Sequence, residues 1–175
     1  MPFINTSIDT SSLPAAEDIG LQPVHRDYKK ILVMEWSFSS LFLVIVGAAL
    51  VFSIDALRES YGWIILTASI LFIIAFHFYS IQRSFPVLAY AVRDHDVAWR
   101  KGWIIRSTRI CPFNRVQNCS VQSGPLERRF GLASLLVYTA GTEGADIRIN
   151  GLTQEEADRL RYFILAKIHK EDEPA

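Results

Sequence analysis

The sequence has few cysteines and histidines, two residue types that often build catalytic or metal centres. Its 175 residues include two cysteines, which form no Cys-x-x-Cys pair, and four scattered histidines. It contains no Gly-x-Ser-x-Gly, His-Glu-x-x-His or glycine-rich phosphate-binding motif. An active site needs a nucleophile, a base or a metal set in a pocket. We therefore expect a protein that is not an enzyme and that carries no cofactor and no metal.

An excess of charge of one sign is also lacking. The chain has 18 Lys and Arg residues against 18 Asp and Glu residues, so its formal net charge is zero. Proteins that bind nucleic acid through their overall field are strongly basic, and we therefore expect no nucleic-acid partner. Cys111 and Cys119 are interpreted as reduced residues in or near strands, because a disulfide would need an oxidising compartment.

Long hydrophobic runs, in contrast, are present twice. Residues 36–54 contain 19 residues without a charge, and residues 62–81 contain 20 residues with a single histidine. A bilayer core requires about 20 apolar helical residues. Neither run leaves a polar face, and backbone groups in lipid must be satisfied within the segment. The sequence thus predicts a transmembrane helical hairpin over residues 31–82, with its two spans joined by a short turn.

The flanking charges predict the orientation of this hairpin. Basic residues precede the first span and follow the second, whereas the turn between them carries only Arg58. Because Lys and Arg are retained inside, both termini should be cytoplasmic. We expect a multi-pass protein of the bacterial cytoplasmic membrane, preceded by a disordered and basic lead-in over residues 1–30 and ending in an acidic tail over residues 171–175.

His77 is the one titratable side chain, tyrosines aside, within a predicted span. Such a residue is a candidate haem ligand or proton relay. It also lies close to the polar residues that end the span, which favours an ordinary position at the membrane interface. The interfacial interpretation is preferred, and the haem- or proton-handling function is kept as an alternative.

The pattern changes after residue 82 to that of a small folded domain over residues 83–170. Short alternating segments predict strands at about 87–93, 97–100, 103–110, 115–124, 133–141 and 145–151. Pro112 should interrupt this pattern, because proline cannot lie in a central ladder. Thr153 and Glu156 form a capping box before a stripe of apolar residues, which predicts a final amphipathic helix. The fold class expected is α+β.

The stretch "PFNRVQNCSVQSGPLERRFGLASLLVYTAG", followed by "IRINGLTQEEADRL", resembles the bacterial pleckstrin-homology-like (PH-like) domains of the YdbS-like group. The shared features are a proline before an Arg-Val-Gln strand, a Gly-Pro-Leu-x-Arg-x-Phe-Gly segment, a strand ending in Thr-Ala-Gly and a capped final helix. The two spans before the motif also fit that group. The resemblance implies about six or seven antiparallel strands closed by the C-terminal helix.

The segment between the fourth and fifth predicted strands has two interpretations. In the structural one, Gly124 and Pro125 turn the chain, Phe130 packs into the domain, and Gly131 takes a conformation, or makes a close approach, that a side chain would forbid. In the functional one, exposed arginines meet anionic lipid headgroups or an acidic partner; the candidates are Arg115, Arg128 and Arg129. Residues 83–129 hold nine Lys or Arg residues against three acidic ones.

The function expected from these features is binding rather than catalysis. We expect a membrane-anchored interaction or scaffold module whose partners are the lipid bilayer and either further copies of itself or a related PH-domain membrane protein. The alternative is a cytoplasmic domain that binds anionic phospholipid. Small sheets have exposed edges that favour association, whereas sharing a fold with lipid-binding domains does not by itself establish lipid specificity.

Overall fold

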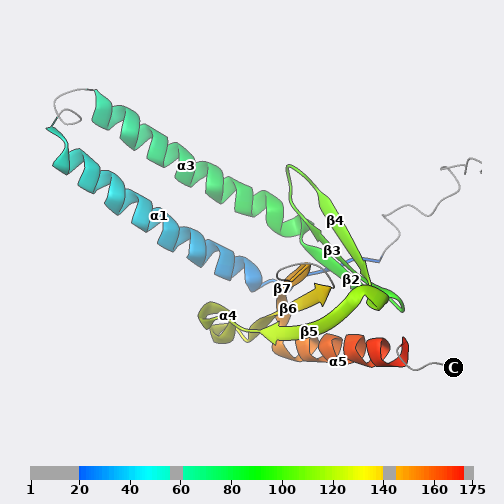
Figure 1. The fold of residues 1–175 in the computed structure, drawn as a ribbon. Helices are drawn as coiled ribbons and strands as arrows, with labels where there is room; N and C mark the ends of the chain where they lie inside the picture. Colours follow the sequence, from blue (N-terminus) through cyan, green and yellow to red (C-terminus); the bar gives the residue numbers. More distant parts are fainter. Residues whose placement is uncertain (1–19, 56–60, 140–144, 172–175) are drawn as a thin grey trace, which may run out of the picture.

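A computed structural model describes residues 20–55, 61–139 and 145–171, which form a long helical hairpin and a mixed domain at its base (Figure 1). The lead-in over 1–19, the turn at residues 141–144 and residues 172–175 of the tail lie outside the described residues. The fold is α+β and PH-like, as the sequence predicted: two apolar helices, two antiparallel sheets and a C-terminal helix.

The hairpin consists of helix α1 (Tyr28–Ser53) and helix α3 (Gly62–Ser84), which lie side by side. Both are long and apolar enough to cross a membrane; 26 and 23 residues at about 1.5 Å each give roughly 39 and 35 Å. Their large apolar side chains point outward, and that of Phe72 is 70% exposed. Such a surface suits lipid and not water, which agrees with the spans predicted at 36–54 and 62–81.

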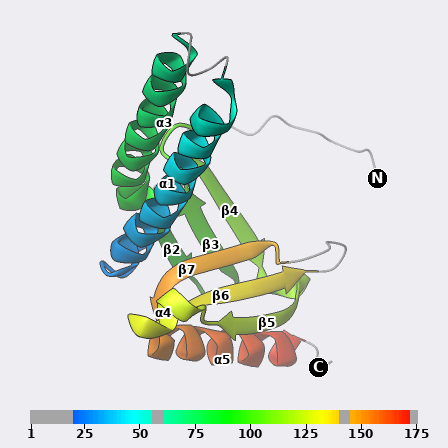
Figure 2. The same ribbon diagram turned by 90° about the vertical axis from the view of Figure 1, so that its left-hand side faces the viewer.

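The domain contains two antiparallel sheets that face each other (Figure 2). The first has the order β1-β2-β3-β4, with strands Gln22–Pro23, Ala89–Val92, Asp96–Lys101 and Ser107–Pro112. The second has the order β5-β6-β7, with strands Val116–Gln122, Leu132–Thr139 and Ile147–Thr153. Short 3-10 helices, Phe85–Val87 and Phe113–Arg115, connect α3 to β2 and β4 to β5.

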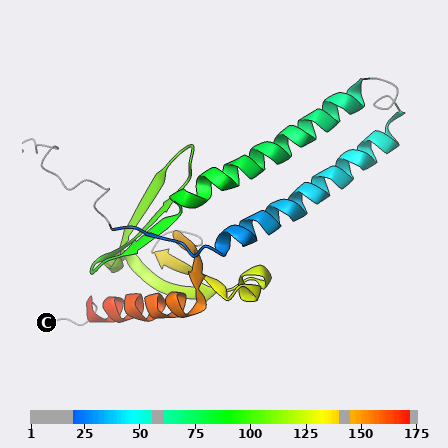
Figure 3. The same cartoon turned by 180° about the vertical axis from the view of Figure 1, so that it is seen from behind.

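Helix α5 (Gln154–Glu171) covers the second sheet on the side away from the hairpin (Figures 1 and 3). Its predicted capping box is confirmed: the Glu156 amide donates to Thr153 Oγ1 at 3.2 Å, and the Thr153 amide donates to Glu156 Oε2 at 3.0 Å. Ala157 and Ile164 are buried along the predicted apolar stripe. The helix thereby closes a core that includes Phe113, from the 3-10 helix after β4.

The predicted start of the third strand requires correction. The third strand begins at Ser107 rather than at residue 103, because Gly102 turns the chain with φ +88° and residues 103–106 form a loop. Pro112 interrupts the strand pattern as predicted, because β4 ends there and a short 3-10 helix follows. It pairs with Asp96 at the last position of β4, an edge strand, where a missing N–H is tolerated.

The predicted boundary between a disordered lead-in and the domain is also wrong. Residues Gln22 and Pro23 form β1, which pairs with Tyr90 and Ala89 of β2. Val24 is buried, and α1 begins at Tyr28, well before the predicted span. The described part of the lead-in therefore belongs to the domain, which residues 83–170 alone do not complete.

Candidate functional site

The basic segment after β5 is a short helix, α4 (Pro125–Arg129), and not a simple turn. Gly124 precedes the helix, and its amide donates to Glu127 Oε2 at 2.8 Å. Phe130 ends the helix and packs against the core, as expected. Gly131 has φ +65° and no atom within 4 Å of an added Cβ, so of the two predicted reasons for glycine the left-handed conformation applies and the close approach does not. Arg128 and Arg129 project from this firmly held helix and are exposed.

Glu127 holds α4 in place, a role that the sequence reasoning missed by counting it among surface charges. Its side chain is buried, and the Ser134 hydroxyl on β6 donates to Glu127 Oε1 at 2.6 Å. A signal was present, because an acidic residue three positions after a helix N-cap accepts from the N-cap amide. Here the N-cap is Gly124, and the proline that follows occupies the first helical position.

The structure does not bring the three candidate arginines together. Arg115 ends the connection before β5, whereas Arg128 and Arg129 follow the other end of that strand. Seven strand residues at about 3.3 Å each separate the two positions by roughly 20 Å. Helix α4 lies beside the start of α1 in all three ribbon views, whereas Arg115 lies directly before β5, at the other end of that strand.

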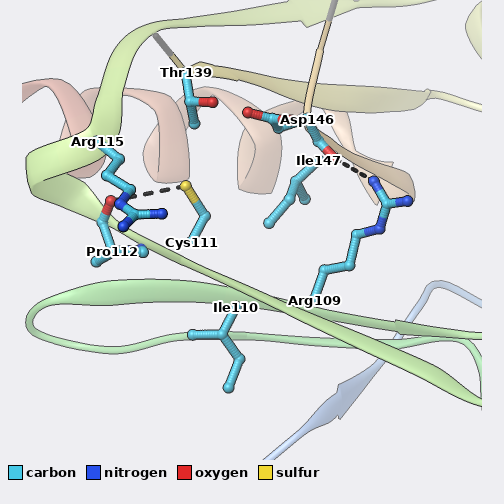
Figure 4. Close-up of a pocket in the computed structure, with 8 residues that line it drawn as sticks. All are labelled: Arg109, Ile110, Cys111, Pro112, Arg115, Thr139, Asp146 and Ile147. Carbon is cyan, nitrogen blue, oxygen red and sulfur yellow. Dashed lines mark hydrogen bonds between the residues drawn. The ribbon is translucent and has the colours of Figure 1, made fainter. Parts of the chain in front are cut away.

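Arg115 instead lines a pocket of about 270 Å³ where edge strand β4 approaches edge strand β7 (Figure 4). Arg109 Nη1 donates to the Asp146 carbonyl oxygen across this gap at 3.1 Å. The other lining residues are Ile110, Cys111, Pro112, Thr139 and Ile147. The two guanidinium groups share this opening with the Asp146 side chain, so the pocket is not purely basic.

The thiols are poor nucleophiles. Burial raises the pKa of the Cys111 thiol, and burial raises the pKa of the Cys119 thiol to about 11. Since the thiolate is the reactive species, both side chains stay protonated and unreactive near neutral pH. The cysteines are unpaired and buried, as the sequence suggested. Within the described ranges no three His, Cys, Asp or Glu side chains gather in a way that could hold a metal ion.

The joint between hairpin and domain is closely packed. Tyr28 and Ile31, on the first turns of α1, are 9% and 1% exposed and belong to the domain core. The His25 amide donates to the Gly151 carbonyl at 2.8 Å. Gly151 has φ +75°, and a Cβ there would lie 2.6 Å from Tyr28 Cγ, so only glycine fits. Ile81, near the end of α3, is also buried.

Farther along the hairpin, α1 and α3 leave an apolar hollow of about 470 Å³ between them. The space beside Gly47 is filled, because the Ile70 side chain packs where a Cβ of residue 47 would lie. The hollow is lined by Val44, Gly47, Ala48, Val51, Phe52, Leu66, Thr67, Ile70 and Leu71. At the other end of α3, His77 is exposed three residues before Ser80, the point where the domain touches this helix.

Comparison with known proteins shows that the hairpin and the domain belong to one family pattern. The sequence model of the family described as "Bacterial PH domain" matches residues 33–168, which span most of the hairpin and nearly all of the domain. The chain belongs to the bacterial PH domain family. Because the match begins within α1, the hairpin is part of the family pattern and not an addition to it.

A curated relative of this bacterial PH domain protein is the "UPF0699 transmembrane protein YdbS" of Bacillus subtilis (strain 168). It is 35% identical over 88 residues, which are 49% of this chain and 54% of the relative. The alignment thus spans about half the length of the relative. No solved structure gives a significant match. The resemblance seen in the sequence is confirmed: this is a YdbS-like membrane protein, in a family that is not a known class of enzyme.

Proposed function

We propose that this bacterial PH domain protein is a membrane-anchored interaction module that acts by binding and not by catalysis. It works through association with further copies of itself or with a related membrane protein that carries the same domain. In this proposal the hairpin crosses the bacterial cytoplasmic membrane twice, with both termini in the cytoplasm. Arg26, Lys29 and Lys30 at the start of α1 and Arg83 at the end of α3 favour that orientation.

The observation that carries the proposal is the apolar hollow between α1 and α3. Two helices alone leave about 470 Å³ there open to the surrounding lipid. Membrane helices associate through close packing at small residues, because lipid offers no hydrophobic driving force between them. Ala48 lines the hollow, and its small side chain leaves room for a third helix to approach closely. A helix from a second copy or a related protein would fill a gap that the hairpin leaves unfilled.

The joint at Tyr28 and Ile31 supports the same function from the domain side. Helix α1 enters the domain core without a flexible linker, so the spans fix how the domain faces the membrane. Copies that assemble through their spans would therefore present their domains in a defined arrangement. Edge strand β4 would then be available for contacts between domains.

A pair of neighbouring alanines provides the test. Ala48 lines the hollow, whereas Ala49 is exposed on the same helix and does not. Ala48→Phe should reduce energy transfer between donor- and acceptor-labelled copies reconstituted in liposomes, and Ala49→Phe should leave it near the wild-type level. Equal energy transfer in both variants would remove the hollow as the site of association.

A second candidate function, the binding of anionic phospholipid, is favoured by the position of α4. Its Arg128 and Arg129 are exposed beside the start of α1, and Lys30 Nζ lies 5.9 Å from the Phe130 ring centroid. Basic residues near an anionic leaflet contribute about 1 kcal/mol each. Arg115, at the far end of β5, is the natural control.

Native mass spectrometry of the full chain would count retained phosphatidylglycerol molecules. The double variant Arg128→Ala/Arg129→Ala should retain fewer of them than Arg115→Ala, and the difference should shrink as salt is added, because salt screens exposed charges. Equal retention by the two variants would leave these arginines as solvated charges that set the topology.

A further inference from the structure

The loop between β3 and β4 is the most apolar exposed part of the domain. It reads Gly102-Trp-Ile-Ile-Arg106, and the side chains of Ile104 and Ile105 are 67% and 81% exposed. A soluble domain gains nothing by presenting two adjacent isoleucines at a loop tip. Exposed apolar groups with a charged rim mark a contact surface.

The backbone of this loop is preformed. Strands β3 and β4 pair as far as Lys101 and Ser107, which closes a loop of five residues. Gly102 has φ +88°, and a Cβ there would collide with the Ile105 carbonyl oxygen. The loop is therefore a tight structure that holds its tip in place, and glycine is required at its entrance.

The loop is also fixed against the hairpin. Trp103 Nε1 donates to Ser80 Oγ on α3 at 2.8 Å, and the Trp103 and Tyr79 rings meet edge to face at 5.6 Å. The β3–β4 hairpin rises along α3 toward the spans, whereas α5 lies on the opposite side of the domain (Figures 1 and 3). Ser80 lies within α3, before its end at Ser84, so the loop tip reaches the level of the last turns of the span.

The charges around the tip match a membrane surface. Lys101 and Arg106 flank the apolar residues and are exposed, and Arg83 on α3 lies near the same level as Ser80. Tryptophan is enriched at membrane–water interfaces because its ring is apolar and its N–H is polar. Interfacial segments bind anionic bilayers in this way, with apolar groups facing the acyl chains and basic groups at the level of the headgroups.

We propose that the Trp103–Arg106 loop is a second membrane contact of this protein, separate from its two spans. Ile104 and Ile105 insert at the boundary between headgroups and acyl chains in the leaflet where α3 ends. Lys101 and Arg106 bind the anionic headgroups around them. The loop thereby holds the first sheet against the bilayer. Together with the joint at Tyr28 and Ile31, it fixes the orientation of the domain relative to the membrane.

The test places single environment-sensitive fluorophores on the full chain in liposomes of phosphatidylcholine and phosphatidylglycerol. Ile105→Cys labels the loop tip, Phe72→Cys labels the middle of α3, and Tyr162→Cys labels the exposed face of α5. Cys111 and Cys119 are buried, so the unsubstituted chain gives the labelling background. Quenching is measured with aqueous iodide and with doxyl-labelled lipid.

The label at position 105 should behave like the label at 72, with strong lipid quenching and loss of iodide quenching, whereas the label at 162 should show the reverse. Iodide quenching at 105 as strong as at 162, with 72 still shielded, would overturn the loop contact and leave the hairpin intact. Strong iodide quenching of the labels at both 105 and 72 would overturn the loop contact and also the membrane-spanning position of α3. Shielding at 105 without lipid quenching would also overturn the proposal, since it would indicate a protein partner.

Discussion

The clearest consequence of the joint is that residues 83–175 should not fold by themselves. That fragment lacks strand β1 and three core side chains, those of Val24, Tyr28 and Ile31. Burying a large apolar side chain contributes about 1.5–3 kcal/mol, so the three together contribute roughly 5–9 kcal/mol. The free energy of unfolding of a whole domain is only about 5–15 kcal/mol. The loss is therefore comparable to the total stability.

A matched pair of fragments tests this reasoning. Residues 83–175 alone should show weak near-ultraviolet circular dichroism and no cooperative transition in urea. Residues 20–34 joined to residues 83–175 through a flexible linker should recover both, because α1 and α3 lie side by side and the linker need only replace the hairpin. A lone 83–175 fragment that unfolds cooperatively at the same urea midpoint as the fusion would refute the account of the joint.

Four further predictions concern single positions. Glu127→Ala should lower the free energy of unfolding by about 3 kcal/mol or more, because two donors lose a charged acceptor, whereas Arg128→Ala should stay within about 0.5 kcal/mol in the same urea titration. Gly131→Val should cost roughly 1–2 kcal/mol from its left-handed backbone alone, since no atom lies within 4 Å of the new Cβ; an unchanged thermal midpoint would contradict this. The Cys119 thiol binds its proton more tightly folded than unfolded, so the stability it adds is present below about pH 9 and is lost as the pH rises to about 11; alkylation in the native state should be slow at pH 8. A membrane-impermeant thiol reagent should label Asp55→Cys from outside the cell and Arg128→Cys only after permeabilisation, and the reverse pattern would invert the proposed topology.

The sequence predicted well those elements whose signals are local. The two spans follow from uninterrupted apolar runs, and α5 follows from a capping box and a 3.6-residue stripe. The need for glycine at position 131 was also predicted, and the structure assigns it to a left-handed backbone and not to a close approach, because no atom lies within 4 Å of an added Cβ. In each of these cases neighbouring residues alone determine the structure.

Apart from the missed cap of α4, the failures involve contacts between distant parts of the chain. Residues 103–106 alternate like a strand, yet Trp103 leaves the sheet to bond with Ser80 on α3. Gln22 and Pro23 look like part of a polar lead-in, and only their pairing with β2, more than 60 residues later, makes them a strand. The wide separation of Arg115 from Arg128 likewise depends on the seven residues of β5 that lie between them.

The number of chains in one assembly tests the central claim most directly. Native mass spectrometry of the full-length protein, released from nanodiscs of its own membrane lipids, gives this number without any substitution. The account predicts two or more copies, or one copy together with a related PH-domain membrane protein. A single chain of 19.9 kDa that carries lipid but no protein partner would contradict it.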